Sequence, residues 1–311
     1  MNPKVSVIIP TKNRAHYISF AIKSVLDQTF KDFELIVCDA ASTDNTEEVV
    51  GKFDDERIRY IREDIDRGVS ACRNIGIRNS KGTFVAFLDD DDLWMPSKLE
   101  KQLGLIETKL SVGAVTTGSW VVNQRGKIVR FEIPSVKGKI FPAILRKNYV
   151  GNCSAVLVRR ECLEKVGMFD ENLHAAEDHD LWIRLAKYYE FECARGYLVS
   201  HRIHETNIST DRQRVLRATK LLHDKHSKEL MRLPDRRKIL GAWHYELGML
   251  YCECGNACQG RKELVKAVAN DPSSIRYDGR LFVSFLGSSA SNLLLGSSYQ
   301  YNTRIILYRY S

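Results

Sequence analysis

Residues 82–96 read GTFVAFLDDDDLWMP, an apolar run that ends in four consecutive aspartates. The residues from Thr83 to Leu88 are apolar or β-branched, which is typical of a short strand buried on both faces of a parallel sheet. Because neighbouring carboxylates repel one another, Asp89–Asp92 favour a divalent cation with oxygen ligands, Mg²⁺ or Mn²⁺. Ligands of open α/β sheets bind at the carboxyl ends of strands, where these aspartates lie. A solvated acidic loop is the alternative interpretation.

The segments on both sides of this run alternate between two apolar patterns. Short continuous apolar runs indicate buried strands, and apolar residues at helical spacing indicate amphipathic helices. Such alternation predicts an α/β fold with a mostly parallel, Rossmann-like sheet flanked by helices. We expect strands at 5–10, 33–38, 58–61, 83–88, 112–122 and 153–158, and helices around 18–26, 46–50, 69–78, 97–108, 144–149, 160–166 and 177–185.

Two common nucleotide-binding patterns do not follow the first predicted strand. There is no Gly-x-Gly-x-x-Gly sequence, which argues against a dinucleotide-binding enzyme, and no Walker lysine loop, which argues against a P-loop kinase. The eight cysteines are scattered through apolar or helical contexts, so we expect reduced thiols rather than a disulfide framework.

Charged residues stand beside several predicted elements at positions where ligands bind. Asp39 ends the second strand and the loop Thr11–Arg14 follows the first, so both lie at one edge of a parallel sheet. Glu177 and Asp178 stand at the start of a helix, whose dipole favours ionised carboxylates. Such a carboxylate suits general-base catalysis, and a simple N-cap role is the alternative for Asp178.

Charge is distributed unevenly along the 311 residues, whose net charge is +8. From Arg212 onward the chain has 17 Lys and Arg against 8 Asp and Glu, a net of +9, whereas the preceding residues have 30 against 31. We therefore expect a nearly neutral domain at 1–210 and a basic α-helical region at 211–311. A basic face attracts anionic membranes, nucleic acids or acidic glycans. Because no nucleic-acid-binding motif is present, we expect no nucleic-acid partner, and a solvated helical surface is the alternative.

Two patterns in the basic region predict how its apolar residues are buried. Residues 242–272 resemble one tetratricopeptide repeat, a helix pair that cannot bury its apolar face alone. Residues 275–311 contain apolar positions broken by Ser and Gly, too polar to span a membrane but suited to its surface. We expect peripheral contact with an anionic membrane through the residues after Arg212, and a homo-oligomer through the C-terminal helices is the alternative.

Six motifs together resemble the family 2 glycosyltransferases, and the resemblance covers about residues 4–210. It implies the GT-A fold and inverting transfer of a sugar from a nucleotide-sugar, most commonly a UDP-sugar. The acceptor would be a hydroxyl of a surface polysaccharide or a lipid-linked glycan, and the reaction would be cytoplasmic, at the inner face of the membrane. The motifs are VSVIIPTKNR at 5–14, SVLDQT at 24–29, DAASTD at 39–44, ACRNIG at 71–76, the four aspartates and Glu177-Asp178.

The resemblance also implies roles for the acidic residues of the donor side. Asp39 corresponds to the carboxylate that accepts a hydrogen bond from the nucleotide base. Asp89 and Asp91 correspond to the outer members of an Asp-x-Asp motif, in which Asp91 binds Mn²⁺ or Mg²⁺ on the diphosphate and Asp89 faces the ribose or the metal. Because four aspartates follow one another, Asp90 and Asp92 are alternatives in this register.

Other residues take roles by their position in the same motifs. Asp178 corresponds to the general base, with Glu177 as the second candidate. Arg202 and His204 resemble a closing Arg-x-His loop, a basic pair that would neutralise the diphosphate, and His204 is a further metal-ligand candidate. The remaining donor-binding candidates are Pro10, Thr11, Asn13, Arg14, Arg73 and Asp90.

Two other functions compete with this interpretation. A metal-dependent nucleotidyltransferase also combines an α/β sheet with paired aspartates, but no Gly-rich basic loop follows the first strand. A non-enzymatic helical-repeat scaffold on an inactive transferase domain is the second rival. Intact Asp39, Asp89, Asp91 and Asp178 argue against an inactive domain.

Overall fold

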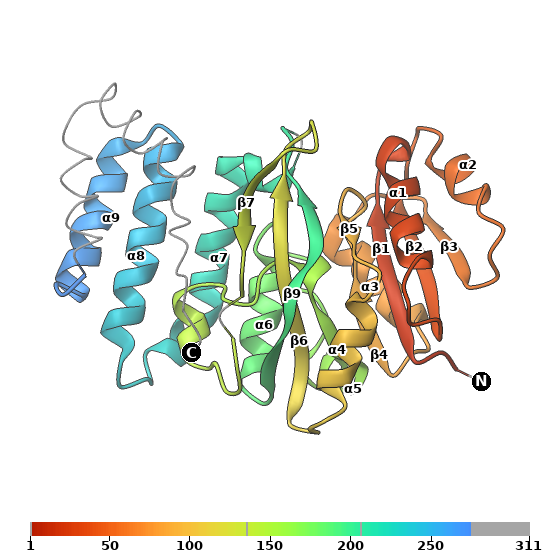
Figure 1. Cartoon of the computed structure of the whole chain (residues 1–311). Coiled ribbons are helices and arrows are strands. Elements are labelled where there is room, and N and C mark those ends of the chain that lie inside the picture. The colour runs from red at the N-terminus through yellow and green to blue at the C-terminus, as the bar shows by residue number, and fades with distance from the viewer. Residues whose placement is uncertain (1, 135, 206, 275–311) are drawn as a thin grey trace. The chain divides into compact units, whose positions relative to one another are not determined.

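The computed structural model describes residues 2–134, 136–205 and 207–274 (Figure 1). The chain divides into two compact units, residues 1–207 and the residues from 208 onward. The first unit is built around one sheet with flanking helices, and the described part of the second is helical.

The sheet contains the nine strands found in the described residues, and its path runs β3-β2-β1-β4-β8-β6-β9-β5, with β7 paired to β6. The strands from β3 to β4 are parallel to one another, as predicted. Beyond them β8 is antiparallel to both β4 and β6, while β6 and β9 are parallel, so the whole sheet is mixed. The strands are β1 Val5–Thr11, β2 Phe33–Ala40, β3 Ile58–Glu63, β4 Phe84–Phe87, β5 Leu93–Trp94, β6 Val112–Val122, β7 Ile128–Glu132, β8 Leu157–Arg159 and β9 Glu190–Arg202.

Helices flank this sheet and bury their apolar sides against it. The apolar stripe Ile18, Ala21, Ile22 and Val25 of α1 belongs to the core that also contains β1 and β2. On α3, Gly76 lies so close to β1 that a Cβ atom there would come within 2.4 Å of the Ile8 side chain. The helices are α1 Ala15–Leu26, α2 Thr46–Gly51, α3 Val69–Asn79, α4 Lys98–Ile106, α5 Arg160–Val166 and α6 Glu177–Ala186.

Two predicted elements are wrong because side chains hydrogen-bond to the nearby backbone instead. The strand expected at 153–158 starts later, since Cys153–Ala155 (η2) is a 3₁₀ helix whose Ala155 N–H donates to the Asn152 side chain. The helix expected at 144–149 is only the 3₁₀ turn Ala143–Arg146 (η1), since Asn148 Oδ1 accepts from two backbone N–H groups that follow it. Strands β5, β7 and β9 were not predicted.

The second unit begins with the short 3₁₀ turn Ile208–Thr210 (η3) and continues with three helices, α7 Arg212–Leu230, α8 Arg236–Glu253 and α9 Ala257–Asn270. Helices α8 and α9 cross closely, since a Cβ atom on Gly260 would lie 2.3 Å from Cys252 Sγ. Stacked rings of His223 and Trp243, 4.3 Å apart, join α7 to α8. A helix pair thus occupies the segment that resembles a tetratricopeptide repeat, and that assignment stays a prediction.

None of the described helices is both long and apolar enough to cross a membrane. The apolar segment 275–311, for which contact with a membrane surface was predicted, lies outside the described residues.

Candidate active site

Two loops at the carboxyl ends of β1 and β2 are fastened to each other by side chains. Asn13, in the left-handed conformation with φ 53°, accepts the Thr43 N–H at 2.7 Å and donates its own N–H to Ser42 Oγ at 2.8 Å. Pro10 is buried within β1, where it pairs with Cys38. These contacts hold the first two strand ends together as one rim of the site.

Asp39 is fully buried at the end of β2 and both of its oxygens are engaged. Its Oδ1 accepts the Ser42 N–H at 2.8 Å, and its Oδ2 accepts the phenol of Tyr60. Burial, followed by this hydrogen bond, raises the pKa of Tyr60, so the phenol stays a donor. Contact of Asp39 with a nucleotide base stays a prediction.

Asp90 points to β1 and bonds to Thr11, whose hydroxyl donates to Asp90 Oδ2 over 2.7 Å. Burial and then the charge of Asp91 raise the pKa of Asp90 well above its ordinary value. A second full negative charge beside Asp91 is therefore disfavoured here.

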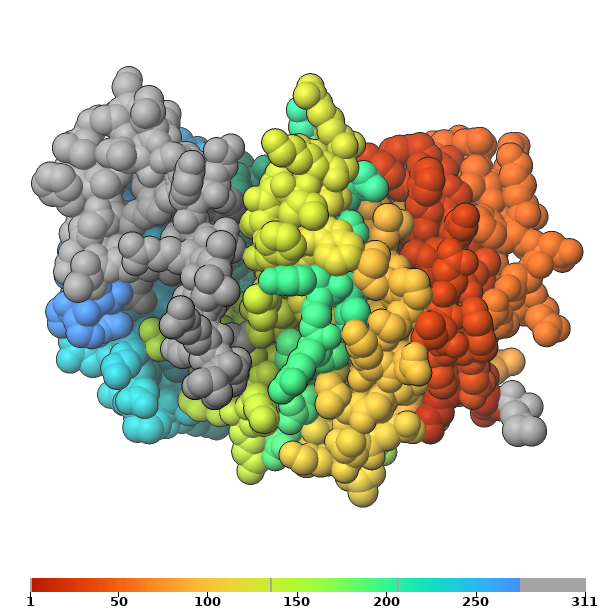
Figure 2. All heavy atoms as spheres, in the orientation of Figure 1, coloured from red at the N-terminus to blue at the C-terminus, as the bar shows by residue number. Residues whose placement is uncertain are grey.

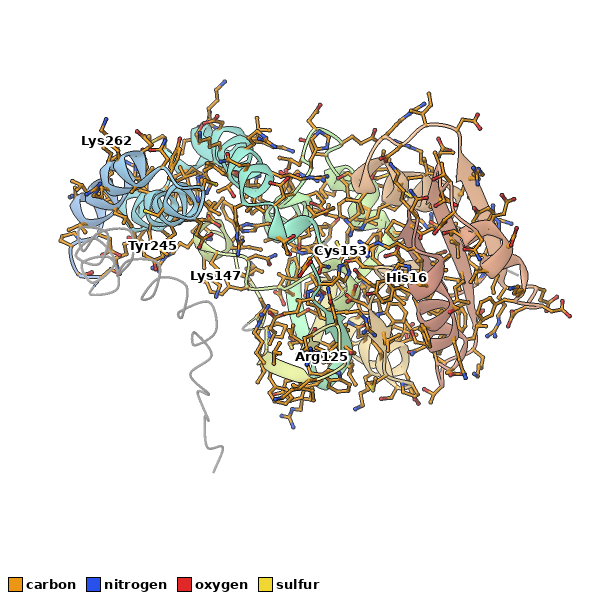
Figure 3. All side chains as sticks on the ribbon, turned by 90° about the horizontal axis from the view of Figure 1, so that it is seen from above. His16, Arg125, Lys147, Cys153, Tyr245 and Lys262 are labelled. Atoms are coloured by element: carbon orange, nitrogen blue, oxygen red, sulfur yellow. The ribbon has the colours of Figure 1, made fainter. Side chains whose placement is uncertain are left out.

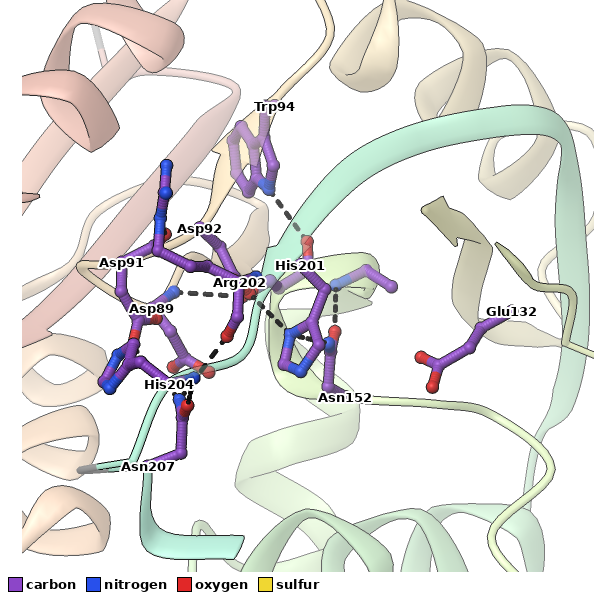
Figure 4. A network of polar contacts seen from close by, with 12 residues as sticks. Asp89, Asp91, Asp92, Trp94, Glu132, Asn152, His201, Arg202, His204 and Asn207 are labelled. Carbon is purple, nitrogen blue, oxygen red and sulfur yellow. Dashed lines mark hydrogen bonds and ion pairs between the residues drawn. The ribbon is translucent and has the colours of Figure 1, made fainter. Parts of the chain in front are cut away.

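Asp91 meets the segment that follows β9 (Figure 4). Its Oδ2 lies 2.8 Å from His204 Nε2 and 3.3 Å from Asn207 Nδ2, and Arg14 Nη1 lies 3.1 Å from the same His204 nitrogen. Burial acts to raise the pKa of Asp91, but the His204 contact and the Arg14 charge outweigh it and hold that pKa below its usual range. The structure thus joins three predicted residues, Asp91, His204 and Arg14, at one point.

Asp92 is fully buried and joins the aspartate loop to the end of β9. It accepts the Arg202 N–H at 2.9 Å, and its Oδ2 lies 3.2 Å from His201 Nδ1, which is 2.9 Å from Asn152 Nδ2 (Figure 4). Burial lowers the pKa of His201, but the Asp92 carboxylate outweighs it and raises that pKa to about 9. Asp92 is therefore a clamp between two segments about a hundred residues apart in sequence.

Three basic side chains lie beside the ring of Tyr17 on α1. The guanidinium carbons of Arg14 and Arg202 lie 5.9 and 5.3 Å from its ring centre, and the His204 ring stacks on it at 5.5 Å. Because cations favour aromatic faces, the ring stabilises two positive charges side by side.

Arg73 on α3 links the aspartate loop to the start of α6. One terminal nitrogen donates to Asp89 Oδ1 at 2.7 Å and the other to Glu177 Oε1 at 2.8 Å, and the side chain is buried. Desolvation works against the charge, but the surrounding thiol and carboxylates outweigh it and raise the pKa of Arg73. Binding of the donor by Arg73, predicted from its motif, stays a prediction.

Asp178 lies in the first turn of α6, after Ala176 in the left-handed conformation. Its Oδ2 is 3.4 Å from Asn148 Nδ2 and its Oδ1 accepts the His179 N–H at 2.6 Å. Burial of the carboxyl group, and then the charge of Glu177, raise its pKa to about 7. A general base is most effective when its pKa lies near the operating pH, so this environment suits that role.

The described residues contain no group of three or more His, Cys, Asp and Glu side chains arranged to hold a metal ion. The four aspartates diverge instead: Asp90 to β1, Asp91 to His204, Asp92 to His201 and Asp89 to Arg73. Two of the aspartates lie beside a histidine, Asp91 beside His204 and Asp92 beside His201.

Sequence reasoning missed several residues of this site. Asp92 was only an alternative in the register of the aspartate run, and His201, Tyr17, Asn148 and Asn152 were not among the predicted site residues. Their roles arise from contacts between distant segments, for which a single sequence carries no signal. The only hint for Asp92 was its place in the aspartate run.

Residues 6–167 match the sequence model of Glycosyl transferase family 2. The chain belongs to this family. It is 32% identical over 215 residues to the Escherichia coli UDP-Glc:alpha-D-GlcNAc-diphosphoundecaprenol beta-1,3-glucosyltransferase WfgD, an alignment that covers 68% of this chain and 82% of WfgD. The residues of this glycosyltransferase that match the family model all lie in the first unit.

Solved structures show the same fold for this glycosyltransferase. S. aureus TarS 1–349 in complex with UDP-GlcNAc superimposes with a TM-score of 0.65 at 19% identity, covering 96% of this chain and 92% of that one. The mannosyltransferase PcManGT from Pyrobaculum calidifontis, in complex with GDP-Man and Mn²⁺, gives 0.60 at 19% identity, with 96% and 80% covered. The first unit thus has the predicted GT-A fold.

Proposed function

We propose that this glycosyltransferase moves a sugar, with inversion, from a UDP-sugar to a hydroxyl of a lipid-linked glycan or growing polysaccharide. The sugar nucleotides named for WfgD and for the TarS complex support the choice of UDP, and the diphosphoundecaprenol named for WfgD supports a lipid-linked acceptor. An acceptor of that kind would place the reaction at a membrane surface, on its cytoplasmic side.

The donor diphosphate would bind beside Arg14, Arg202 and His204. All three groups lie beside the ring of Tyr17. His204 contacts both Arg14 and Asp91, and these contacts orient the Arg14 and His204 side chains. Preorganised cations neutralise charge that grows on a leaving group without reorganising during the reaction. We assign the nucleotide base to the rim that contains Asp39 and Asn13.

A divalent ion would be held by Asp91 and the neutral imidazole of His204, with Asp89 as a third candidate, and in that case Arg14 and Arg202 are the cations that face the diphosphate. A carboxylate and an imidazole are ligands that Mn²⁺ accepts, and metal ions in phosphate chemistry often bind few protein ligands because the substrate phosphates supply the others. When bound, such an ion would act as a Lewis acid on the diphosphate. The Mn²⁺ named for the PcManGT complex supports this assignment.

Asp178 would take the proton of the acceptor hydroxyl. The hydroxyl oxygen bonds to the anomeric carbon while the bond from that carbon to the diphosphate oxygen breaks, and the proton passes to the Asp178 carboxylate. Attack opposite the leaving group inverts the configuration. Arg73 bonds to Glu177 and to Asp89, and so connects the start of α6 to the aspartate loop.

The observation that carries this proposal is the pairing of a cationic donor side with a carboxyl group whose pKa lies near 7. Calorimetric titration of UDP, GDP and dTDP into the full chain, with Mn²⁺ or with EDTA, tests the proposed binding of the donor nucleotide. We expect UDP to bind best and more tightly with Mn²⁺. If none of the three nucleotides binds, the proposal is wrong.

A further inference from the structure

The hairpin of β6 and β7 exposes large apolar side chains that the sugar-transfer chemistry does not use. In β7 and directly after it, Phe131 is 46% and Ile133 70% exposed, and Val129 is also 46% exposed. Phe131 lies in the paired part of β7, Val129 at a β-bulge opposite Val121 and Val122, and Ile133 directly after the strand. Trp120 pairs with Phe131 across the hairpin, so these two side chains define one face, on which Trp120 is partly exposed.

Tyr197 of β9 extends this apolar face. Its ring lies 4.8 Å from that of Phe131, in a tilted arrangement. Exposed apolar side chains that gather in this way mark contact surfaces rather than ordinary surface composition. Aromatic rings are also the side chains that settle at the interface between lipid and water.

Exposed basic residues flank the exposed apolar residues in sequence. Arg125 and Lys127 lie at the tip of the hairpin, Lys137 and Lys139 follow it, and all four are exposed (Arg125 is labelled in Figure 3). The acidic residue of the hairpin, Glu132, bonds to Arg130 at 2.8 Å. The segment 123–139 has five basic residues against one acidic residue, which complements an anionic surface.

The hairpin projects from the edge of the sheet that carries the active site. Val122, next to the turn at the tip of the hairpin, pairs with Arg202, and the Ile203 N–H donates to Val122 O at 2.8 Å. The projection is visible at the top of the space-filling view, in yellow between the other segments (Figure 2). A surface that binds the tip would therefore lie on the side where Asp91 and His204 meet.

We propose that the β6–β7 hairpin, residues 120–133, docks this glycosyltransferase onto an anionic lipid bilayer. Phe131, Ile133 and Val129 would enter the interfacial layer, while Arg125 and Lys127 contact lipid phosphates. The proposal rests on the proposed function only in that a lipid-linked acceptor gives the contact a purpose. It places bilayer contact in the first unit, apart from the basic C-terminal region.

Flotation of the full chain with phosphatidylglycerol or phosphatidylcholine vesicles tests this docking. We expect binding to phosphatidylglycerol at low salt and weak binding to phosphatidylcholine. Phe131→Ser with Ile133→Ser should lower the binding constant roughly tenfold or more, because two large apolar side chains leave the interface. Arg125→Ser with Lys127→Ser should lower it by roughly tenfold, a loss that high salt reproduces in the unchanged protein.

Matched variants separate the hairpin from general loss of apolar or charged surface. Phe20→Ser with Leu110→Ser removes apolar residues that are 59% and 84% exposed elsewhere, and Lys52→Ser with Lys101→Ser removes two exposed lysines. Both should float like the unchanged chain, and all variants should keep its melting temperature. Nucleotide titration is run in parallel, so failure of docking and failure of the proposed function are read separately.

Four outcomes would overturn the docking proposal. The unchanged chain could ignore anionic vesicles at low salt, or bind neutral vesicles as well as anionic ones. The hairpin variants could also float like their controls. Finally, sedimentation velocity could show that the apolar hairpin variant turns a dimer into a monomer, in which case the face binds a second copy of the chain.

Discussion

On the donor side of the site each buried aspartate has a partner of its own. Asp90 has Thr11, Asp91 has His204 and Asp92 has His201. On the base side three carboxylates, those of Asp89, Glu177 and Asp178, surround the single guanidinium of Arg73, which bonds directly to the first two.

The difference has a consequence for proton affinity. Burial and then the charge of Glu177 raise the pKa of Asp178 to about 7, whereas the contact with His204 and the charge of Arg14 outweigh burial and hold the pKa of Asp91 below its usual range. Asp91 on the donor side is thus held ionised beside Asp90, whose pKa is raised, and Asp178 on the base side can exchange a proton near neutral pH.

The largest expected effect comes from removing the base. Asp178→Asn keeps the shape but cannot take the acceptor proton, so transfer should fall by ~10²-fold or more. Affinity for UDP, measured by calorimetry, should stay nearly unchanged because the donor side is intact. Near-normal transfer by this variant would reassign the role to Glu177.

The donor side should respond in binding rather than in proton transfer. Asp91→Ala should abolish the difference in UDP affinity between Mn²⁺ and EDTA, because a metal-binding carboxylate is lost, and the affinity with Mn²⁺ should fall roughly tenfold or more. Asp27→Ala, on an exposed turn after α1, is the control. A variant that kept its preference for Mn²⁺ would place the metal elsewhere in the aspartate run.

Removing the negative or the positive neighbour of Asp178 should shift the pH dependence of kcat/KM in opposite directions. Since Asp178 must be ionised to act as base, kcat/KM should rise with pH through about 7. Glu177→Gln removes a negative neighbour, lowers the pKa of Asp178 and moves this acid limb to lower pH.

Arg73→Gln removes the positive neighbour and should move the same limb to higher pH, while Arg73→Lys should shift it less. A shift in the same direction for Glu177→Gln and Arg73→Gln would show that both variants act by disturbing the fold. Melting temperatures measured across the same pH range separate that case from a change in proton affinity.

The smallest expected effect concerns the support of the site. Asn152 caps the 3₁₀ helix η2 and contacts His201, so Asn152→Ala should lower the free energy of unfolding by ~1 kcal/mol, the usual cost of a lost cap. Chemical denaturation measures it. Asn172→Ala, at an exposed turn, should change the stability far less, and equal losses would deny Asn152 a special role.

The sequence predicted the parallel half of the fold well because local patterns decide it. The continuous apolar runs of β1, β2 and β4 stay buried on both faces, and the apolar spacing of α1 follows one helical stripe. The rest was harder, since β9 is a long strand of mixed polarity whose pairing with β6 is interrupted by register shifts. Its identity depends on partners far away in the chain.

The candidate site shows the same division. The motifs located the aspartates, Arg14, His204 and Asp178. In the structure His204 contacts both Arg14 and Asp91. They could not assign each aspartate its direction, because that depends on Thr11, His201 and Arg73, which approach from three different elements. Tyr17 has no sequence signal beyond its place on a helix.

The two-residue strand β5 pairs only with β9 among the described strands, through Leu93 opposite Ser200 and Trp94 opposite Val199. The aspartate loop that precedes β5 is consequently fixed by residues made more than a hundred positions later. During synthesis the residues of β1 to β4 are made before β9 exists, so Asp92 meets His201, and Asp91 meets His204, only after those later residues have emerged. A nascent chain that stalled before His204 would contain its first strands but lack the contact that orients Asp91.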